Sequence, residues 1–429
     1  MVLNKQEIRV SLKKLISEYF AYTDDEFIAG KTPILTGQAV YDDKELNAIL
    51  DSLLDGWFGL GQKGLQFEKQ FAAYIGTSYG CLVNSGSSAN LLALSSIKIS
   101  YGLASGEIIT PACAFPTTLN PIIQLGFKPA FIDVDSSLNI SPEAVQRAIT
   151  SQTVGIVFAH TLGNPARIAE IKELAEQYNL FLIEDCCDAH GSKYNGEKCG
   201  TYGDCATFSF YPAHTMTMGE GGIVLTSDNE IDRIVRSLRD WGRDCFCTTD
   251  EKSIGGRCGK RFEYELDGIP YDHKYIYSNI GYNLKPLELQ AAMGIEQLKK
   301  LDQFIKKRKK NYKLYEEALE PIKDYLSMPI INRGADPVFF GLPLIIEDPS
   351  IKRNELIRYL NDHNIATRLL FGGNLLRHPA YHDLEYYQYS SLDYTEKLMR
   401  DCFWIGLHPG ITKETVSYVA MVLKDYLSI

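Results

Sequence analysis

Short apolar runs alternate with helical patterns from about residue 65 onward, and this alternation constrains the fold more than any other feature of the sequence. Strand-like runs include YGCLVNSG, KPAFIDVD, TVGIVFAH and LFLIEDCC, and the segments between them include SSANLLALSSI, SPEAVQRAI and IAEIKELAEQYN, which have helical periodicity. Apolar strands separated by helices form a largely parallel sheet that is covered on both faces. The pattern therefore predicts an α/β fold.

Two domains are expected. Residues 1–300 should hold an N-terminal segment and a large domain, and residues 301–429 a smaller α/β domain. One helix should end at Gly76, and Ser141 should be the N-cap of a second helix. A long helix should cover about 286–318. Residues 242–280 show no clear period and hold three cysteines, which predicts a long functional loop. Parallel sheets bind ligands at the carboxyl ends of their strands, so the site should lie there.

Composition excludes several classes of protein. A net charge of −10 argues against a nucleic-acid or anionic-membrane partner. The first 20 residues lack the apolar core of a signal peptide, and no run of 18 apolar residues occurs, so we expect a cytoplasmic protein. The ten cysteines are not expected to form disulfides in that compartment, and most should be small buried hydrophobes.

Two motifs are candidates for ligand contacts. Gly86, Ser87 and Ser88 stand between a strand and a helix, where free amides and hydroxyls can hold a phosphate. Such turns are also common without a ligand. Asp185 ends a buried strand, where a carboxylate needs a partner, and a pyridinium nitrogen would suit it. The alternative is a carboxylate that only caps the following turn.

A third motif runs from Ser209 to Gly222 and contains His214 on a turn between two strands. An imidazole there could act as a general base near neutral pH. A single histidine is more often simply packed or solvated.

Together the three motifs resemble the nucleotide-sugar aminotransferase family of the DegT/StrS type, which has the aspartate aminotransferase fold of type I pyridoxal-phosphate transferases. The resemblance runs from about residue 35 to the C-terminus and includes Thr110–Phe115 and Gly281–Ala292. It implies that the cofactor contacts Gly86, Ser87, Ser88, Phe115, Asp185, Asp188, Ser209 and, across a homodimer, Asn283. Phe115 would stack on the cofactor ring, Asp185 would meet its nitrogen, and Asp188 would lie near its hydroxyl.

One departure from the family is informative. His214 stands where the aminotransferases have the lysine that binds pyridoxal phosphate covalently. Imidazole forms no such stable linkage, so the resemblance implies an unattached cofactor that acts as pyridoxamine phosphate, with His214 as the catalytic base of a dehydration. The surrounding SFYPAH and MGEGG segments resemble the CDP-6-deoxy-4-hexulose 3-dehydrases of that family. A colitose-pathway dehydratase, which also has histidine here but no iron, is the close alternative.

The cysteine spacing bears on this choice. Cys187 and Cys245 have 57 residues between them, Cys245 and Cys247 have one, and Cys247 and Cys258 have ten. Dehydrases with a [2Fe-2S] cluster share the first two gaps, and their last gap is three residues shorter. The resemblance therefore implies that Cys187, Cys245, Cys247 and Cys258 ligate a cluster beside the cofactor, with a loop insertion before Cys258. Zinc, or no metal, is the alternative.

Together with these residues, the resemblance implies a dehydrase that uses pyridoxamine phosphate and [2Fe-2S] to remove the 3-hydroxyl of a nucleotide-linked 4-keto-6-deoxy sugar. The product would serve dideoxysugar and lipopolysaccharide O-antigen biosynthesis. Because the product is reduced, a flavin or iron-sulfur reductase that uses NAD(P)H is an expected partner. CDP is the expected nucleotide and dTDP the next. An iron-free dehydratase or transaminase stays open, whereas a non-catalytic regulator is disfavoured because no DNA-binding segment is present. Four residues are unassigned candidates for the diphosphate: Arg239, Arg243, Arg368 and His378.

Overall fold

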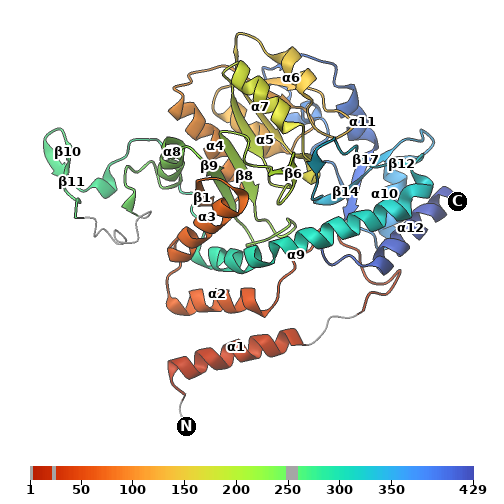
Figure 1. Ribbon diagram of the computed structural model, residues 1–429, viewed down its shortest axis with the longest axis horizontal. Coiled ribbons are helices and arrows are strands. Elements are labelled where there is room, and N and C mark those ends of the chain that lie inside the picture. Colours follow the sequence, from red (N-terminus) through yellow and green to blue (C-terminus); the bar gives the residue numbers. More distant parts are fainter. Residues whose placement is uncertain (1–2, 22–25, 248–258) are drawn as a thin grey trace.

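The large sheet lies at the centre of the molecule (Figure 1). The computed structural model describes residues 3–21, 26–247 and 259–429. The sheet order is β1 (Tyr79–Val83), β9 (Gly222–Thr226), β8 (Cys205–Ser209), β5 (Phe181–Asp185), β4 (Thr153–Ala159), β2 (Glu107–Pro111), β3 (Lys128–Ile132) and β16 (Tyr387–Gln388). Strands from β8 to β16 pair in parallel, and β9 is antiparallel to both of its neighbours. The predicted largely parallel sheet is confirmed.

Helices cover both faces of this sheet. One face packs against α4 (Gly86–Ser100), α5 (Pro116–Gln124) and α8 (Asn229–Arg239). The other packs against α6 (Pro142–Ala148), α7 (Ile168–Gln177) and α3 (Gln62–Ile75). Neighbouring strand residues such as Ile108 and Ile109 enter opposite cores, as the twofold period of a strand requires. This is why the strands are apolar throughout.

The second sheet is smaller and antiparallel. Its order is β12 (Leu326–Ser327), β14 (Gly341–Ile346), β17 (Cys402–Gly406) and β15 (Thr367–Leu369). It lies among α10 (Arg353–Asp362), α11 (Asp393–Asp401) and α12 (Lys413–Leu427). Helix α9 (Glu288–Leu319) contacts α3 and α12, and it runs across the molecule from the α3 side to the α12 side (Figure 1). The boundary expected at residue 300 falls inside this helix.

Local signals in the sequence are also confirmed. Helix α3 ends at Gly76, whose φ of 114° is left-handed, and the Ser141 hydroxyl accepts a hydrogen bond from Ala144 N at the start of α6. The body also contains α1 (Lys5–Ala21), α2 (Asp43–Asp55) and three short strands, β6 (Lys193–Tyr194), β7 (Glu197–Lys198) and β13 (Ala335–Asp336). In the described part of the chain, no helix is long and apolar enough to cross a bilayer.

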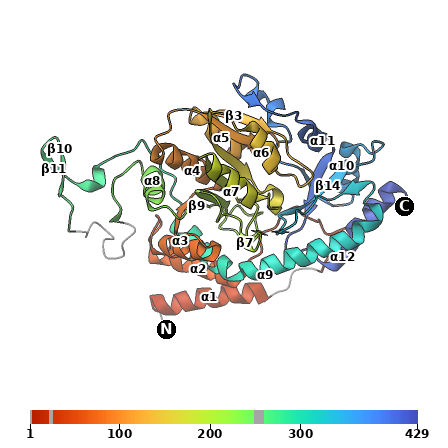
Figure 2. The same cartoon turned by 45° about the horizontal axis from the view of Figure 1, so that its top comes forward.

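Residues 241–247 and 259–282 form an arm that projects from the body beside α8 in both views (Figures 1 and 2). The arm contains the hairpin of β10 (Tyr264–Leu266) and β11 (Ile269–Tyr271), where an irregular loop was expected. Asp267 and Gly268 both have positive φ and form the two-residue turn, and an Asp-Gly pair is a strong hairpin signal. Residues 248–258 of the expected loop, including Cys258, lie outside the described residues.

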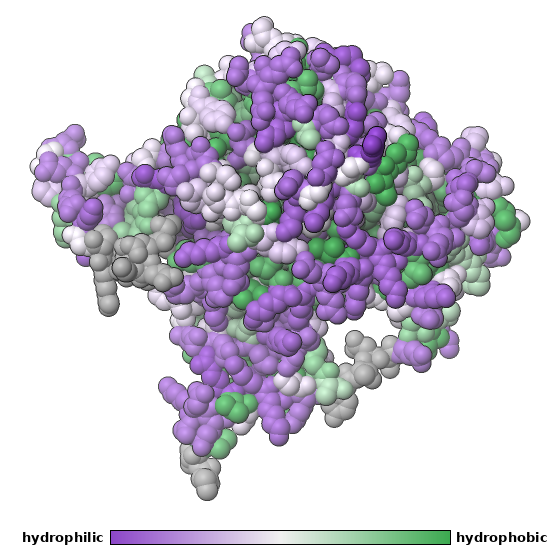
Figure 3. Space-filling model, in the orientation of Figure 1, coloured by the Kyte–Doolittle hydropathy of each residue, from purple (hydrophilic) through white to green (hydrophobic). Residues whose placement is uncertain are grey.

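Apolar side chains of the arm remain uncovered in the single chain. Ile280 is 98% exposed, Ile269 63% and Phe262 61%. The face of the molecule seen in Figure 3 is mostly hydrophilic, with hydrophobic residues visible on the arm.

Candidate active site

A cavity of about 870 Å³ opens at the carboxyl ends of β4, β5 and β8. This is the edge at which parallel sheets bind ligands. Many of the residues expected from the sequence line it: Gly86, Ser87, Phe115, Asp185, Cys187, Asp188, Ser209 and His214. Four other expected residues are not in its lining: Ser88, Asn283, Cys245 and Cys247.

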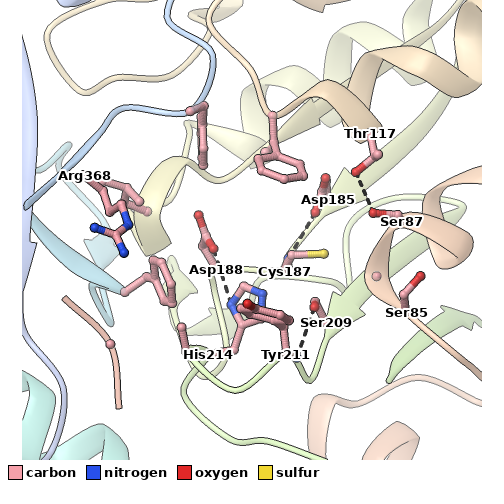
Figure 4. Close-up of a pocket in the computed structure, with 18 of the residues that line it drawn as sticks. Ser85, Ser87, Thr117, Asp185, Cys187, Asp188, Ser209, Tyr211, His214 and Arg368 are labelled. Atoms are coloured by element: carbon pink, nitrogen blue, oxygen red, sulfur yellow. Dashed lines mark hydrogen bonds and ion pairs between the residues drawn. The ribbon is translucent and has the colours of Figure 1, made fainter. Parts of the chain in front are cut away.

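The N-terminus of α4 forms one end of the cavity, with Ser85 and Ser87 side by side (Figure 4). Ser85 caps the helix, since its hydroxyl accepts from Ser88 N at 3.1 Å. The Ser88 hydroxyl lies 3.0 Å from that of Ser85, so Ser88 belongs to the cap rather than to the cavity wall. Ser85 itself also lines the cavity. The free amides and hydroxyls at this end suit a phosphate.

Gly86 keeps this end open. A Cβ atom at Gly86 would lie 2.6 Å from Ser209 Cβ and 2.9 Å from Cys187 Sγ. Both distances are far below van der Waals contact, so any larger residue would push into the space beside these side chains. A glycine is therefore required here by close approach and not by an unusual backbone angle.

Asp185 is held by three donors. Its Oδ2 accepts from Asn90 Nδ2 at 2.8 Å and from Thr118 Oγ1 at 2.7 Å, and its Oδ1 accepts from Cys187 N at 3.1 Å. The orientation of this buried carboxylate is therefore fixed toward the cavity that it lines. Asn90 and Thr118 were not predicted. Asn90 lies four residues after Gly86, on the same face of α4, and that spacing could have identified it.

His214 and Asp188 face each other in the middle of the cavity (Figure 4). The distance from His214 Nδ1 to Asp188 Oδ1 is 3.5 Å. Burial, and then the positive charge of Arg308, lowers the pKa of His214 to about 3. Burial, and then the charge of Asp185, raises the pKa of Asp188 to about 7. At neutral pH His214 is therefore an uncharged imidazole, the form that can accept a proton.

The other end of the cavity carries a cation. Arg368 lies on the side of His214 opposite to Ser85 and Ser87 (Figure 4). Of the four basic residues considered for a diphosphate, Arg368 alone is in the described lining of the cavity. Arg239 is buried and pairs with Glu68 at 2.8 Å, so its role is structural. Phe115, half exposed, lies at the N-terminus of α5 and contacts the ring of Phe371.

The cysteines separate into two places. Cys187 lies in the cavity, whereas Cys245 and Cys247 lie on the arm together with His273. The potential ligand atoms of these three arm residues are within 4.8 Å of one another, and Cys187 is not in that group. The described residues of one chain thus do not bring the expected ligands of an iron-sulfur cluster together. Cys186 is fully buried beside β5, as expected for most of the cysteines.

Comparisons with known proteins agree with this geometry. A family model described as the DegT/DnrJ/EryC1/StrS aminotransferase family matches residues 40–424. The chain is 40% identical to the lipopolysaccharide biosynthesis protein RfbH of Salmonella typhimurium, over 100% of both chains. It is 44% identical to a dTDP-4-dehydro-2,6-dideoxy-D-glucose 3-dehydratase of Saccharopolyspora spinosa, over 94% of this chain and 88% of the relative.

A solved structure is also similar. The E. coli GDP-4-keto-6-deoxy-D-mannose-3-dehydratase with bound hydrated PLP superposes with a TM-score of 0.83 at 31% identity. The match covers 91% of this chain and 99% of that one. The expected type I fold is confirmed, and a cavity that suits pyridoxal or pyridoxamine phosphate is consistent with it.

Proposed function

This chain belongs to the DegT/DnrJ/EryC1/StrS aminotransferase family, and within that family we propose that it is a nucleotide-sugar 3-dehydrase rather than an aminotransferase. The observation that carries the proposal is His214. A neutral imidazole lies in the cavity at the position where the family's aminotransferases have a lysine. Without that lysine the cofactor has no covalent anchor, so pyridoxamine phosphate is the form that the enzyme would use.

The cavity fits this cofactor. When bound, pyridoxamine phosphate supplies an amine that condenses with the 4-ketone and a ring that takes up electrons. Ser85, Gly86, Ser87 and Ser209 would hold its phosphate at the N-terminus of α4. Three cavity residues would contact the cofactor ring: Phe115 on one face, Asp185 at the ring nitrogen and Asp188 near the hydroxyl.

His214 would remove the proton from the exocyclic carbon of the cofactor. Because the pKa of His214 is lowered, its imidazole is unprotonated at neutral pH and can accept this proton directly. Asp188, 3.5 Å from Nδ1, would stabilise the imidazolium that forms. The 3-hydroxyl then leaves with a proton as water. Because hydrogen replaces a hydroxyl at C3, the complete reaction consumes two electrons and two protons, and a separate NAD(P)H-dependent flavin or iron-sulfur reductase would supply the electrons.

Arg368 would bind the diphosphate of the substrate, since it lies at the end of the cavity away from the phosphate site. We propose CDP as the nucleotide from the resemblance of the segments around His214. The similar enzymes named above act on dTDP- and GDP-linked sugars, so all three nucleotides must be compared.

A homodimer with shared sites is part of the proposal. Asn283 is exposed and lies at the base of the arm, where it pairs with Asp240. The uncovered apolar side chains of the arm would be buried against a second copy of the chain. Asn283 would then reach the phosphate site of the neighbouring subunit.

An iron-free dehydratase is the second candidate. In the described residues of one chain, Cys187 does not lie with Cys245 and Cys247. This separation favours a dehydratase without an iron-sulfur cluster. The solved 3-dehydratase is similar over 91% of this chain.

The experiment combines product analysis with spectroscopy. Anaerobically purified enzyme is loaded with pyridoxamine phosphate, mixed with CDP-, dTDP- and GDP-linked 4-keto-6-deoxy sugars plus a reductase and NADH, and the products are identified by mass spectrometry. A 3-deoxy sugar formed only with the reductase supports the proposal. A 4-amino sugar formed with glutamate would identify an aminotransferase, and 3-deoxy product from iron-free protein would identify the second candidate.

A further inference from the structure

Helix α9 carries a buried arginine that the proposed mechanism does not use. Arg308 is 1% exposed, although a guanidinium in the protein interior costs free energy unless its donors are paired. Its Nη1 donates to Phe340 O at 2.8 Å and to Phe339 O at 3.2 Å. Its Nε and Nη2 have no hydrogen-bond partner among the described residues. Packing alone gives no reason for a cation at this position, so its function has to be sought nearby.

The guanidinium of Arg308 lies close to His214 without lining the cavity. Burial, and then the positive charge of Arg308, lowers the pKa of His214, and the same two causes lower the pKa of His408. A single charge acts on a buried group in this way only when it is near that group. Arg308 is therefore a neighbour of the proposed base, placed behind the cavity wall.

The carbonyl groups that Arg308 binds belong to a segment that packs against His214. The centroid of the Phe340 ring lies 5.0 Å from that of the imidazole. Phe340 also lines the cavity, and its backbone N donates to Leu162 O at 2.8 Å. Hydrogen bonds thus hold the backbone of Phe340 from two directions, from α9 and from the turn at Leu162.

The turn at Leu162 is itself strained. Leu162 has a φ of 48°, in the left-handed region that leucine rarely adopts, and Gly163 follows with a φ of 84°. A Cβ at Gly163 would clash with the carbonyl oxygens of Val338 and Asp188, so the turn passes tightly between these two backbones. A strained turn persists only where its surroundings fix it. Here the turn connects the backbone of Asp188 to the segment that holds Phe340.

The orientation of His214 depends on this packing. Its Nδ1 has no hydrogen-bond partner in the described part of the chain, and Asp188 Oδ1 lies 3.5 Å away (Figure 4). A general base has to keep its ring nitrogen within hydrogen-bond reach of the proton that it removes. The imidazole is therefore aligned by its contacts with Phe340 and with the ring of His190, whose centroid is 6.0 Å away.

We propose that Arg308 is a positioning residue for His214: by holding the backbone of Phe340 it keeps the imidazole aligned in the cavity. The inference rests on the proposed function, because it takes His214 as the base. It assigns the guanidinium to alignment rather than to stability, since an incompletely paired cation does not stabilise a protein interior. Replacing Arg308 should therefore slow proton removal without unfolding the enzyme.

The test compares three variants of the full-length protein with the wild type: Arg308→Met, Arg308→Lys and Tyr315→Phe. Methionine removes the charge and the donors, whereas lysine keeps the charge and one donor group. Tyr315→Phe is the matched control. Tyr315 is also fully buried on α9, and its hydroxyl has no partner among the residues that the structure describes, but it packs in the core around the smaller sheet.

Three quantities are measured. Crystal structures of the cofactor-free proteins give the distance from His214 Nδ1 to Asp188 Oδ1, and urea unfolding gives the stability. The third is the loss of deuterium from the exocyclic carbon of labelled pyridoxamine phosphate, followed in a single turnover with each of the three 4-keto sugars at several concentrations. This step uses neither the reductase nor iron, and it separates the maximal rate from the half-saturating sugar concentration.

Arg308→Met should unfold at a urea concentration no lower than that of the wild type. Its maximal rate of deuterium loss should fall about 10- to 100-fold, because a base displaced by about 1 Å loses that much rate, whereas the half-saturating sugar concentration should stay within about threefold. Its crystal structure should show the imidazole turned away from Asp188. Arg308→Lys should keep the rate within about threefold, since its ammonium can donate to Phe340 O. Tyr315→Phe should match the wild type in rate and in the position of His214.

Three results would overturn the proposal. The first is an Arg308→Met crystal structure in which His214 has not moved, and the second is a wild-type rate in that variant. The third is an Arg308→Met protein that unfolds more easily or does not fold while Arg308→Lys is as slow as the loss predicted for methionine, because Arg308 would then be structural. Wild-type protein that loses no deuterium with any sugar would instead refute the proposed function, and the crystal structures would still decide whether Arg308 aligns the imidazole.

Discussion

Replacing Gly86 by alanine should weaken cofactor binding, because the added methyl group would clash with the side chains packed against Gly86. The added Cβ would lie 2.6 Å from Ser209 Cβ, about 1 Å closer than the 3.5–4.0 Å of normal carbon contacts. Ser209 cannot simply move away, because it ends β8 and pairs with Gly222, which itself packs on the backbone of Ser85. Either the helix start or the Ser209 side chain must shift.

That shift removes at least one donor from the phosphate. A hydrogen bond to a charged group contributes about 1.5–3 kcal/mol, and each 1.4 kcal/mol is a factor of about ten in affinity. The Kd for pyridoxamine phosphate should therefore rise about 10- to 100-fold. Overpacking also lowers the free energy of unfolding by about 1–3 kcal/mol.

The assay is a titration of cofactor-free protein with pyridoxamine phosphate, followed by absorbance or calorimetry, with urea unfolding of the same samples. Gly59→Ala is the matched control, because a Cβ there meets nothing within 4 Å. Ser209→Ala removes the hydroxyl without adding atoms, and it keeps the test valid if the Gly86 variant folds poorly. Cofactor affinities within twofold of wild type in both folded site variants would refute the assignment of this turn to the phosphate.

Further predictions concern the reacting groups. Asn90→Ala should lower kcat about 10- to 100-fold, because it removes a hydrogen bond to the charged carboxylate of Asp185. The control Ser96→Ala, on the same helix, should leave kcat unchanged. Equal kcat values in the two variants would contradict the prediction. His214→Asn should abolish turnover while cofactor titration shows retained binding. Because the pKa of His214 is about 3 in the folded protein and near 6.5 when unfolded, wild type loses stability as pH falls below 6.5, by about 2 kcal/mol at pH 5. Urea midpoints of His214→Asn should lack this loss, and parallel pH curves would argue against it. Mixing subunits of His214→Asn and Asn283→Ala should restore activity if sites are shared, and persistent inactivity of mixed dimers would exclude that.

Local periodicity determined the architecture of this protein. Apolar strands alternate with helices, so the parallel sheet and the edge that carries the site follow from the order of residues along the chain. Asp185 ends a strand and His214 stands on the turn between two strands, and their chemistry depends on residue type. The turn at Asp267 and Gly268 was also readable from the sequence, although the arm was expected to be irregular.

Tertiary structure decided which side chains meet. Asn90 and Thr118 converge on Asp185 from two helices, and His273 reaches Cys247 through the antiparallel register of the arm. The spacing from Gly86 could have placed Asn90 on the cavity side of α4, but it does not specify these contacts, because they join elements whose separation in space depends on how the helices pack and how the strands pair. The same holds for the pKa of His214, which depends on burial by residues distant in sequence. The order of residues along the chain determines whether a segment forms a helix or a strand. Only tertiary packing determines the distances between side chains of different elements.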